Sequence, residues 1–260
     1  MKIDILTLFP EMFAPLKVSM IGRAEEKGIL NINLTDIRDY TKDKHNRTDD
    51  YPFGGGVGMV MMADPVFSAL KAVDAGNKKI LYMSPKGRVL DQDKIQELSA
   101  EKELVILCGH YEGIDERILE GWDIEEISIG DYVLTGGEPA AIVLVDAVAR
   151  MIPGVLSHDE SAMDESIYSG LLEYPQYTKP REYEGANVPE VLLSGNHKAI
   201  RLWRFEQALR LTMERRPDLF EKFLEKCGFS GSEGTDSKGS GNKVLDKDEK
   251  KVLEMVLKER

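Results

Sequence analysis

The 260-residue sequence has few of the residues that staple small domains or hold metals: two cysteines and four histidines. Cys108 and Cys227 lack a CxxC partner, and the histidines are scattered singly without metal-ligand spacing. These absences exclude a disulfide scaffold and a zinc module. They predict no metal held by the protein, and they favour a reducing cytoplasm as the compartment.

Long apolar runs are also missing. No run reaches the ~18 residues that a membrane span needs, so no membrane partner is expected. The start of the chain places Asp4 inside what would be the apolar part of a signal peptide, so no export signal is expected either. With 42% hydrophobic and 31% charged residues, the composition is that of a globular protein able to bury a core.

An excess of positive charge is the third absence: 34 basic against 46 acidic residues give a net charge of −12. That total argues against a nucleic-acid partner, because phosphate binding needs a basic surface. Residues 196–217 nevertheless sum to +4, leaving −16 for the rest. This stretch is either a basic patch on an acidic body or the solvated face of an amphipathic helix. Its basic residues are Lys198, Arg201, Arg204, Arg210, Arg215 and Arg216.

The first part of the chain alternates strand-like and helix-like patterns. The strand-like runs are 3–9, 29–37, 79–84, 104–108 and 127–134, and the helical patterns are 10–27, 66–73, 91–98, 112–119 and 138–152. Such alternation predicts an α/β domain with a mostly parallel sheet and helices on both faces. The pattern at 138–152 is apolar almost all round, which predicts a helix buried on most sides.

The composition and the periodicity of the sequence change after residue 156. Residues 157–172 are polar and acidic and predict a linker, and 173–260 predict a helical domain with helices at 200–213, 218–226 and 246–258. A Gly/Ser-rich insertion at 228–242 is typical of disorder. The predicted domains are therefore 1–156 and 173–260.

Three glycine-bearing segments, 53–59, 108–117 and 129–139, are candidates for chemistry, and the last two join a strand to a helix. Ligands in open α/β sheets lie beyond the carboxyl ends of strands, where glycine lets the backbone approach closely. Neither GxGxxG nor GxxxxGK[ST] is present. Because the two later loops also lack Lys and Arg in their glycine cores, they favour an uncharged or zwitterionic ligand over a triphosphate.

The runs 5–13, 54–62, 108–117, 129–139 and 192–197, in this order, resemble the bacterial tRNA (guanine-37-N1)-methyltransferase family, TrmD. The likeness covers about residues 1–227 and implies a SPOUT-type parallel sheet with a deep trefoil knot, plus a small all-helical C-terminal domain that binds tRNA. It further implies a homodimer and methyl transfer from S-adenosylmethionine to N1 of guanosine 37. Mg²⁺ dependence is a family trait with no ligand set visible in this sequence.

Matching the family motifs residue by residue assigns two sets of binding positions. The resemblance places S-adenosylmethionine against Tyr82, Met83, Ser84, Pro85, Gly109, Tyr111, Glu112, Gly113, Ile129, Gly130, Asp131, Tyr132, Val133, Leu134, Gly136 and Gly137. It places the RNA substrate against Gly55, Gly56, Ser194, His197, Lys198 and Arg201.

The resemblance also implies the catalytic groups. Guanine N1 is protonated at neutral pH, so a carboxylate must accept its proton and a cation must stabilise the charge that spreads to the carbonyl oxygen. The arginine matches Arg150. The family's aspartate falls on Glu165, with Asp164 as the alternative one place earlier. By themselves these would be read as a helix C-terminal charge and two solvated linker acids.

Two other functions stay open. One is a non-catalytic RNA-binding or scaffold protein with a degenerate cofactor fold, which is favoured if Glu165 cannot act as the base. The other is a related SPOUT enzyme that methylates a ribose hydroxyl. The methylated atom, and the response of RNA binding to replacing Arg150 or Glu165, distinguish the three.

Overall fold

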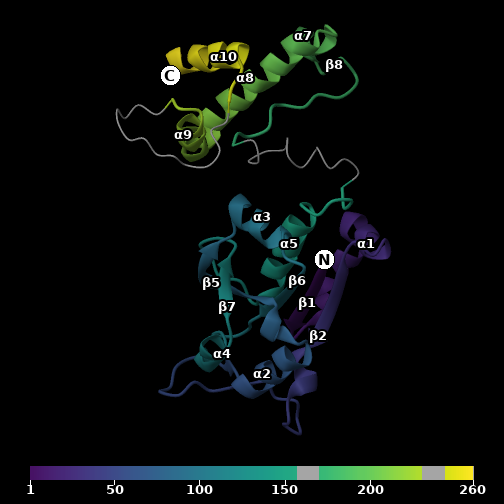
Figure 1. Ribbon diagram of the computed structural model, residues 1–260, viewed down its shortest axis with the longest axis vertical. Coiled ribbons are helices and arrows are strands. Elements are labelled where there is room, and N and C mark those ends of the chain that lie inside the picture. Colours follow the sequence, from purple (N-terminus) through teal and green to yellow (C-terminus); the bar gives the residue numbers. More distant parts are fainter. Residues whose placement is uncertain (157–169, 230–243, 260) are drawn as a thin grey trace. The chain divides into compact units, whose positions relative to one another are not determined.

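The computed structural model describes residues 1–156, 170–229 and 244–259, and the chain divides into two compact units, 1–159 and 160–260 (Figure 1). Each unit is described by itself. The predicted linker at 157–172 and the insertion at 228–242 lie mostly outside the described residues.

A five-stranded parallel sheet forms the centre of the first unit. Its strands are β1 (Lys2–Thr7), β2 (Asn31–Asp36), β5 (Lys79–Val89), β6 (Glu103–Cys108) and β7 (Ile124–Ser128). They lie in the order β2-β1-β6-β5-β7, with every neighbouring pair parallel. The predicted α/β class with a mostly parallel sheet is therefore confirmed.

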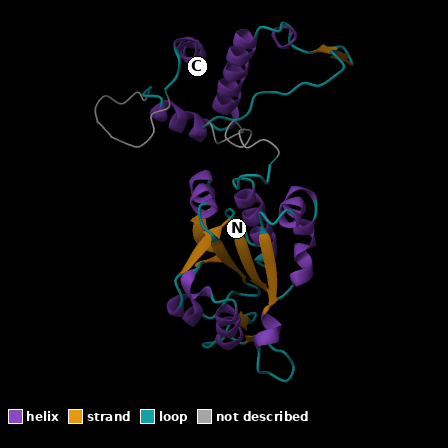
Figure 2. Ribbon diagram, turned by 45° about the vertical axis from the view of Figure 1, so that its right-hand side comes forward, coloured by secondary structure: helices purple, strands orange, loops and turns teal. Residues whose placement is uncertain are grey.

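Successive strand residues point to opposite faces, and both faces are buried. Ile5, Leu81 and Ile106 pack in one hydrophobic cluster with residues of η1 (Pro10–Lys17), α1 (Ser19–Glu26), α3 (Gln92–Ser99) and α5 (Glu138–Ala149). Leu6 and Val105 pack in the other with residues of η2 (Ile37–Tyr40), α2 (Ala63–Ala72) and α4 (Glu116–Gly121). Figure 2 shows the strands between these helices. Burial on both faces explains why the strands read as near-continuous apolar runs.

Three predicted elements differ from the structure. The pattern at 10–27 forms a 3-10 helix and then α1, because Pro15 cannot donate a backbone hydrogen bond and Ser19 adopts a φ of 62°. The strand predicted at 127–134 is β7 at Ile124–Ser128, and 129–134 form a loop. The helix predicted at 112–119 begins later, at Glu116, after its N-cap Asp115.

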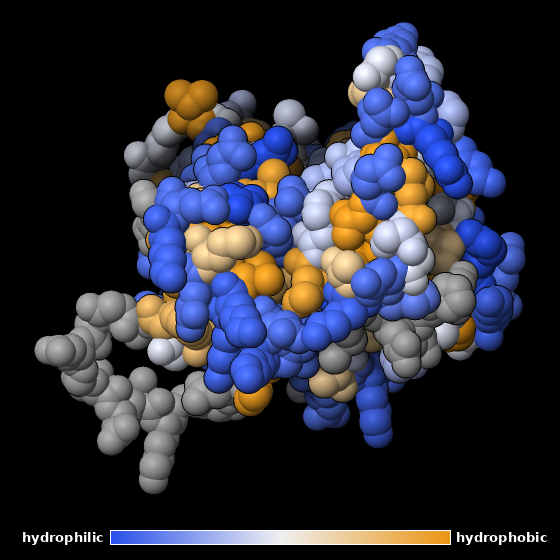
Figure 3. Space-filling view, turned by 90° about the horizontal axis from the view of Figure 1, so that it is seen from above, coloured by the Kyte–Doolittle hydropathy of each residue, from blue (hydrophilic) through white to orange (hydrophobic). Residues whose placement is uncertain are grey.

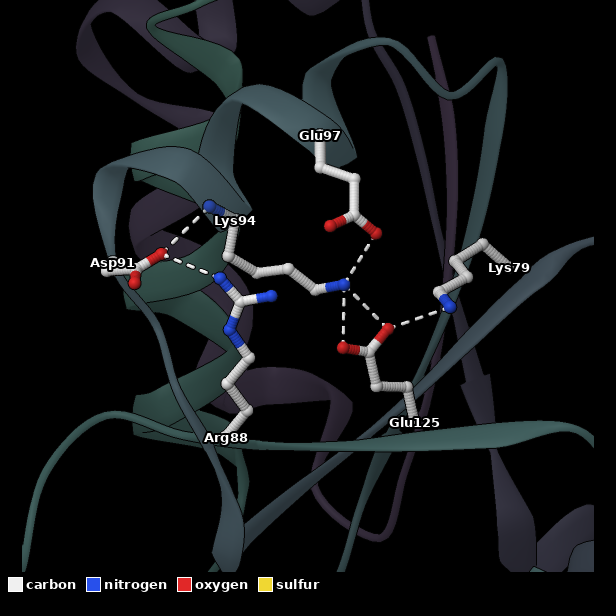
Figure 4. Close-up of polar contacts among 6 residues, drawn as sticks. All are labelled: Lys79, Arg88, Asp91, Lys94, Glu97 and Glu125. Carbon is white, nitrogen blue, oxygen red and sulfur yellow. Dashed lines mark hydrogen bonds and ion pairs between the residues drawn. The ribbon is translucent and has the colours of Figure 1, made fainter. Parts of the chain in front are cut away.

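An ion-pair network around the buried Lys94 lies near the point where β5 bulges out of the sheet. Met83 and Arg88 both pair with Ile127, so the residues between them bulge out as a loop. Lys94 of α3 is only 2% exposed, and its ammonium contacts Glu125 of β7 at 2.6 Å and Glu97 at 2.7 Å (Figure 4). Lys94 thus connects α3 to β7, the strand that pairs with β5 on both sides of this loop.

The second unit is helical with one short hairpin. It contains α7 (Glu190–Leu193), α8 (His197–Arg215), α9 (Pro217–Lys226) and α10 (Lys247–Lys258), packed around Leu209, Phe220 and Leu253. The all-helical prediction is wrong in one respect, because β8 (Glu182–Tyr183) and β9 (Ala186–Asn187) form an antiparallel pair. Glu184 and Gly185 between them have φ of 50° and 81°, the backbone of a tight two-residue hairpin turn.

Candidate functional site

Loops from three strand ends line a single cavity in the first unit. It contains every residue that the resemblance assigned to the cofactor except Asp131, so segments from 82–85, 109–113 and 129–137 meet as expected. The sequence did not single out the other lining residues: Lys86, His110, Ile114, Glu116, Leu119, Glu126, Ile127, Ser128, Thr135 and Ala140.

Glycine allows the backbones to approach one another at this cavity. The Gly137 amide donates to the Gly109 carbonyl at 2.8 Å, and a Cβ on Gly137 would lie 2.9 Å from the Cys108 Cα. A Cβ on Gly109 would lie 2.7 Å from the Tyr82 ring. A larger residue at Gly137 would push the third loop, at 129–137, away from the end of β6, and one at Gly109 would fill part of the cavity.

The cavity wall is acidic. Three carboxylates line it, from Glu112, Glu116 and Glu126, against the single ammonium of Lys86. Burial, followed by the Glu126 charge, raises the pKa of Tyr82 to about 12, so its hydroxyl stays protonated at neutral pH. The wall therefore offers protonated hydroxyl and carboxylate groups and favours a ligand that carries positive charge.

A buried polar triad lies behind the cavity. Glu138, at the start of α5, is fully buried and accepts a hydrogen bond from the Thr7 hydroxyl at 2.6 Å. Its other oxygen contacts His110 Nε2 at 2.7 Å. The positive end of the α5 dipole favours a carboxylate here. Sequence reasoning missed this triad because Thr7, His110 and Glu138 come from three separate segments, although each lies inside a quoted motif.

The glycine loop at 54–58 borders the same cavity. The Met59 carbonyl accepts a hydrogen bond from the Glu112 amide, and a Cβ on Gly58 would lie 2.5 Å from the Glu112 carboxylate. Gly55 and Gly56 have φ of 80° and 137° and are exposed. The predicted substrate-contacting loop therefore stands at the rim of the predicted cofactor site.

Comparison with known proteins gives a consistent result. The family model described as "tRNA (Guanine-1)-methyltransferase TrmD" matches residues 1–222. A tRNA (guanine-N(1)-)-methyltransferase of Clostridium acetobutylicum is 58% identical over 225 residues, which cover 86% of this chain and 93% of that protein. One from Ruminiclostridium cellulolyticum is 58% identical over 87% of this chain and 99% of that protein. The Clostridium novyi protein of the same name is 52% identical over all of this chain and 99% of its own.

The chain belongs to the TrmD family. The resemblance inferred from the motifs is thus confirmed. The TrmD motifs at 5–13, 108–117 and 129–139, which are far apart in sequence, meet at the carboxyl ends of the strands, and the segment at 54–62 contacts them there.

Of the TrmD catalytic candidates, only Arg150 lies in the described part of the chain. Arg150 follows the last residue of α5, whereas Gly137 and Ala140 at its beginning line the cavity. A helix of 12 residues spans roughly 18 Å. Arg150 therefore lies far from the cavity of its own chain. Glu165 and Asp164 lie outside the described residues.

The predicted RNA-contacting residues of the second unit lie around the start of α8. Ser194 and His197 are exposed. Lys198 pairs with Asp248 at 2.5 Å, and Arg201 pairs with Asp246 at 2.6 Å and Glu249 at 2.7 Å. Acids at the beginning of α10 thus already neutralise two of the predicted basic contacts.

No three His, Cys, Asp or Glu side chains gather as a metal site within 1–156, 170–229 and 244–259. The residues in these ranges do not fit a resident Mg²⁺, and no chemical step is assigned to one. No helix in the same ranges is both long and apolar enough to cross a membrane.

Proposed function

We propose that the protein transfers a methyl group from S-adenosylmethionine to N1 of guanosine 37 in tRNA, in the cytoplasm. One observation carries the proposal: the three loops of the TrmD motifs, at the ends of β5, β6 and β7, form one cavity with close backbone contacts and an acidic wall. The names of the relatives support the reaction class.

The cavity fits this methyl donor chemically. S-adenosylmethionine carries a sulfonium and an ammonium, and the wall carries Glu112, Glu116 and Glu126. Backbone groups of Ile129–Leu134 can read the adenine edge, and Leu134 supplies an apolar surface. The cavity measures about 230 Å³, below the ~300–1,000 Å³ typical of small-molecule sites.

Side chains of the protein itself would deprotonate the guanine and stabilise its charge. When bound, the cofactor supplies an electrophilic methyl group. Glu165, with Asp164 as the alternative, would accept the N1 proton, a contribution of roughly 10²–10⁴ in rate. The Arg150 guanidinium would stabilise the negative charge on the guanine carbonyl oxygen.

The position of Arg150 favours a homodimer in which each active site uses residues of both chains. Since α5 separates Arg150 from the cavity of its own chain, the arginine would serve the cavity of a second copy. Val143 on α5 is 48% exposed although most of that helix is apolar, which is consistent with a contact surface for another chain. In a two-fold dimer each chain then gives an arginine and receives one.

A mixed dimer tests this arrangement. Gly109→Val should close one chain's cavity and Arg150→Ala should remove the other chain's arginine, so each variant alone is inactive. If the site is shared, the mixed dimer keeps one complete site and about half of the wild-type activity. An inactive mixed dimer would show that Arg150 acts within its own chain.

The deep trefoil knot is part of the same proposal. β7 is at the edge of the sheet, yet residues after it return to the end of β6, where His110 bridges Gly136, and so cross the end of β5. Such a return is what threading through the loop at 84–87 requires, although chains rarely thread loops.

Labelled S-adenosylmethionine and two tRNAs that carry guanosine or adenosine at position 37 test the reaction. We expect label on N1 of guanosine only. Label on a ribose hydroxyl would identify the related ribose enzyme instead. tRNA binding without any transfer, unaffected by Arg150→Ala and Glu165→Gln, would identify the non-catalytic RNA-binding protein.

A further inference from the structure

The second unit has a groove of its own, of about 900 Å³, between the segment at 174–181 and helices α7 and α8. Its walls combine aromatic, aliphatic and cationic side chains and include no Asp or Glu. The lining residues are Tyr174, Pro175, Gln176, Tyr177, Thr178, Lys179, Pro180, Arg181, Val188, Leu192, Leu193, Ile200 and Arg204. In a chain with a net charge of −12, an acid-free groove is unexpected.

The fold holds the aromatic and cationic groups in place. The Arg204 guanidinium lies over the Tyr174 ring at 4.8 Å, and the Tyr177 and Trp203 rings are 6.4 Å apart. Ile200 and Arg204 are one helical turn apart on α8 and share a face. At the other end, the Val188 amide donates to the Arg181 carbonyl at 2.9 Å, which fixes Arg181 at the base of the hairpin.

The basic residues of this unit differ in how far their charge is countered. Lys198, Arg201, Arg210 and Arg216 of the basic stretch all make ion pairs. Within 170–229 and 244–259, no ion pair involves Lys179, Arg181 or Arg204. The groove therefore gathers three cations whose charge no ion pair in these ranges counters, whereas Lys198 and Arg201, on the face of α8 that meets α10, are paired. On the face shown in Figure 3, apolar side chains reach the surface in patches bordered by hydrophilic ones.

We propose that this groove binds an unpaired nucleotide of the tRNA, distinct from the guanosine that is methylated. Its base stacks against Tyr177, which is 47% exposed, and its phosphates meet Arg204 and Lys179. Aromatic faces bind bases of any sequence, and uncountered cations bind phosphate. This assignment rests on the proposed function for the identity of the RNA.

The test measures the affinity of the full-length protein for a tRNA transcript over a range of salt concentrations. Tyr177→Ala should weaken binding about tenfold, as loss of one stacked base does, and Tyr177→Phe should restore it. Arg204→Gln should reduce the slope of log affinity against log salt by about 0.7–1. The matched control is Arg210→Gln, on the same helix but paired with Glu206 and Glu259, which should keep the slope.

Cofactor affinity is the second readout, because the groove lies wholly in the second unit and its variants should leave S-adenosylmethionine binding unchanged. Wild-type affinity and slope for both groove variants would overturn the proposal and leave the groove to another occupant, such as a protein segment. A reduced slope for Arg201→Gln but not for Arg204→Gln would also overturn it. If the wild type binds tRNA through the groove but methylates nothing, the proposed function fails and the groove assignment stands.

Discussion

The two cavities of this protein are opposite in charge. The cavity at the strand ends has three carboxylates and one lysine, whereas the groove of the second unit has two arginines, one lysine and no acid. The first matches a methyl donor that carries a sulfonium, and the second matches a polyanion. A chain with a net charge of −12 can thus bind RNA if its acids are placed elsewhere or are already paired.

The two cavities also differ in construction. Backbone packing at Gly109 and Gly137 shapes the first, on a sheet buried on both faces. The second is formed by an irregular segment against two helices, with exposed charged side chains. We therefore expect substitutions at the first to act through steric overlap and burial, and those at the second to act through charge.

The largest effect should come from Gly137→Ala. The new Cβ would lie 2.9 Å from the Cys108 Cα and 3.0 Å from the Gly109 nitrogen, so the third loop must shift. Misplacement on this scale can cost about 100-fold in reaction rate, and cofactor affinity measured by calorimetry should fall as well. tRNA affinity at the second groove should be unchanged. Gly76→Ala, where no atom lies within 4 Å of the added Cβ, is the control; equal losses in both variants would contradict the steric account.

The next effect tests the buried charges of the first unit. Lys94→Ala removes a buried side chain and leaves Glu125, whose side chain is 25% exposed, with only Lys79 as its partner. It should lower the free energy of unfolding by about 3 kcal/mol, the lower end of the range for breaking a buried pair. Denaturant titration measures it. Lys71→Ala, at an exposed position of α2, should have little effect. In the second unit Arg210→Gln should change stability only slightly, because exposed pairs are weak. A loss as large as that of Lys94→Ala would contradict the expected difference between the ion pairs of the two units.

A smaller loss is expected from Glu138→Gln. The amide would turn a donor toward either Thr7 or His110, where the carboxylate accepts, and an unsatisfied buried group costs about 1–3 kcal/mol. Melting temperature and cofactor affinity should both fall. Adding His110→Arg to Glu138→Gln should restore neither the melting temperature nor the cofactor affinity, since it leaves the Thr7 contact unchanged. Alone, His110→Arg should keep activity, because a guanidinium can donate to Glu138. An inactive His110→Arg variant would show that the imidazole itself is required.

The smallest expected effect is a loss of stability at low pH. Burial alone raises the pKa of Asp4, but hydrogen bonds from Asn33 and Lys78 outweigh it and leave that pKa below 3.8. A lowered carboxylate pKa stabilises the fold above the unfolded value of about 3.9, and this stability is lost as pH falls through the folded value. Melting temperature should thus fall below about pH 4, and less so in Asp4→Asn. The exposed control Asp123→Asn should follow the wild type.

Several features could be predicted from the sequence because they depend on local patterns. Strand–helix alternation gave the α/β class, and glycines at strand ends indicated where the loops would be. Other features could not. The break before α1 depends on Ser19 adopting a positive φ, and the hairpin at 182–187 is too short to produce a periodic signal. Likewise, the basic stretch at 196–217 gave no indication that α10 would pair with Lys198 and Arg201.

The sequence by itself determined the family, the parallel sheet and all but ten of the residues that line the first cavity, because motif order and apolar periodicity are properties of the chain read in one direction. Only the tertiary structure decided which charges stay available, that Glu138 joins Thr7 to His110, and that Arg150 lies a helix length away from its own cavity. Those outcomes depend on which distant segments become neighbours in space, and that neighbourhood is fixed when the sheet and the helices pack together.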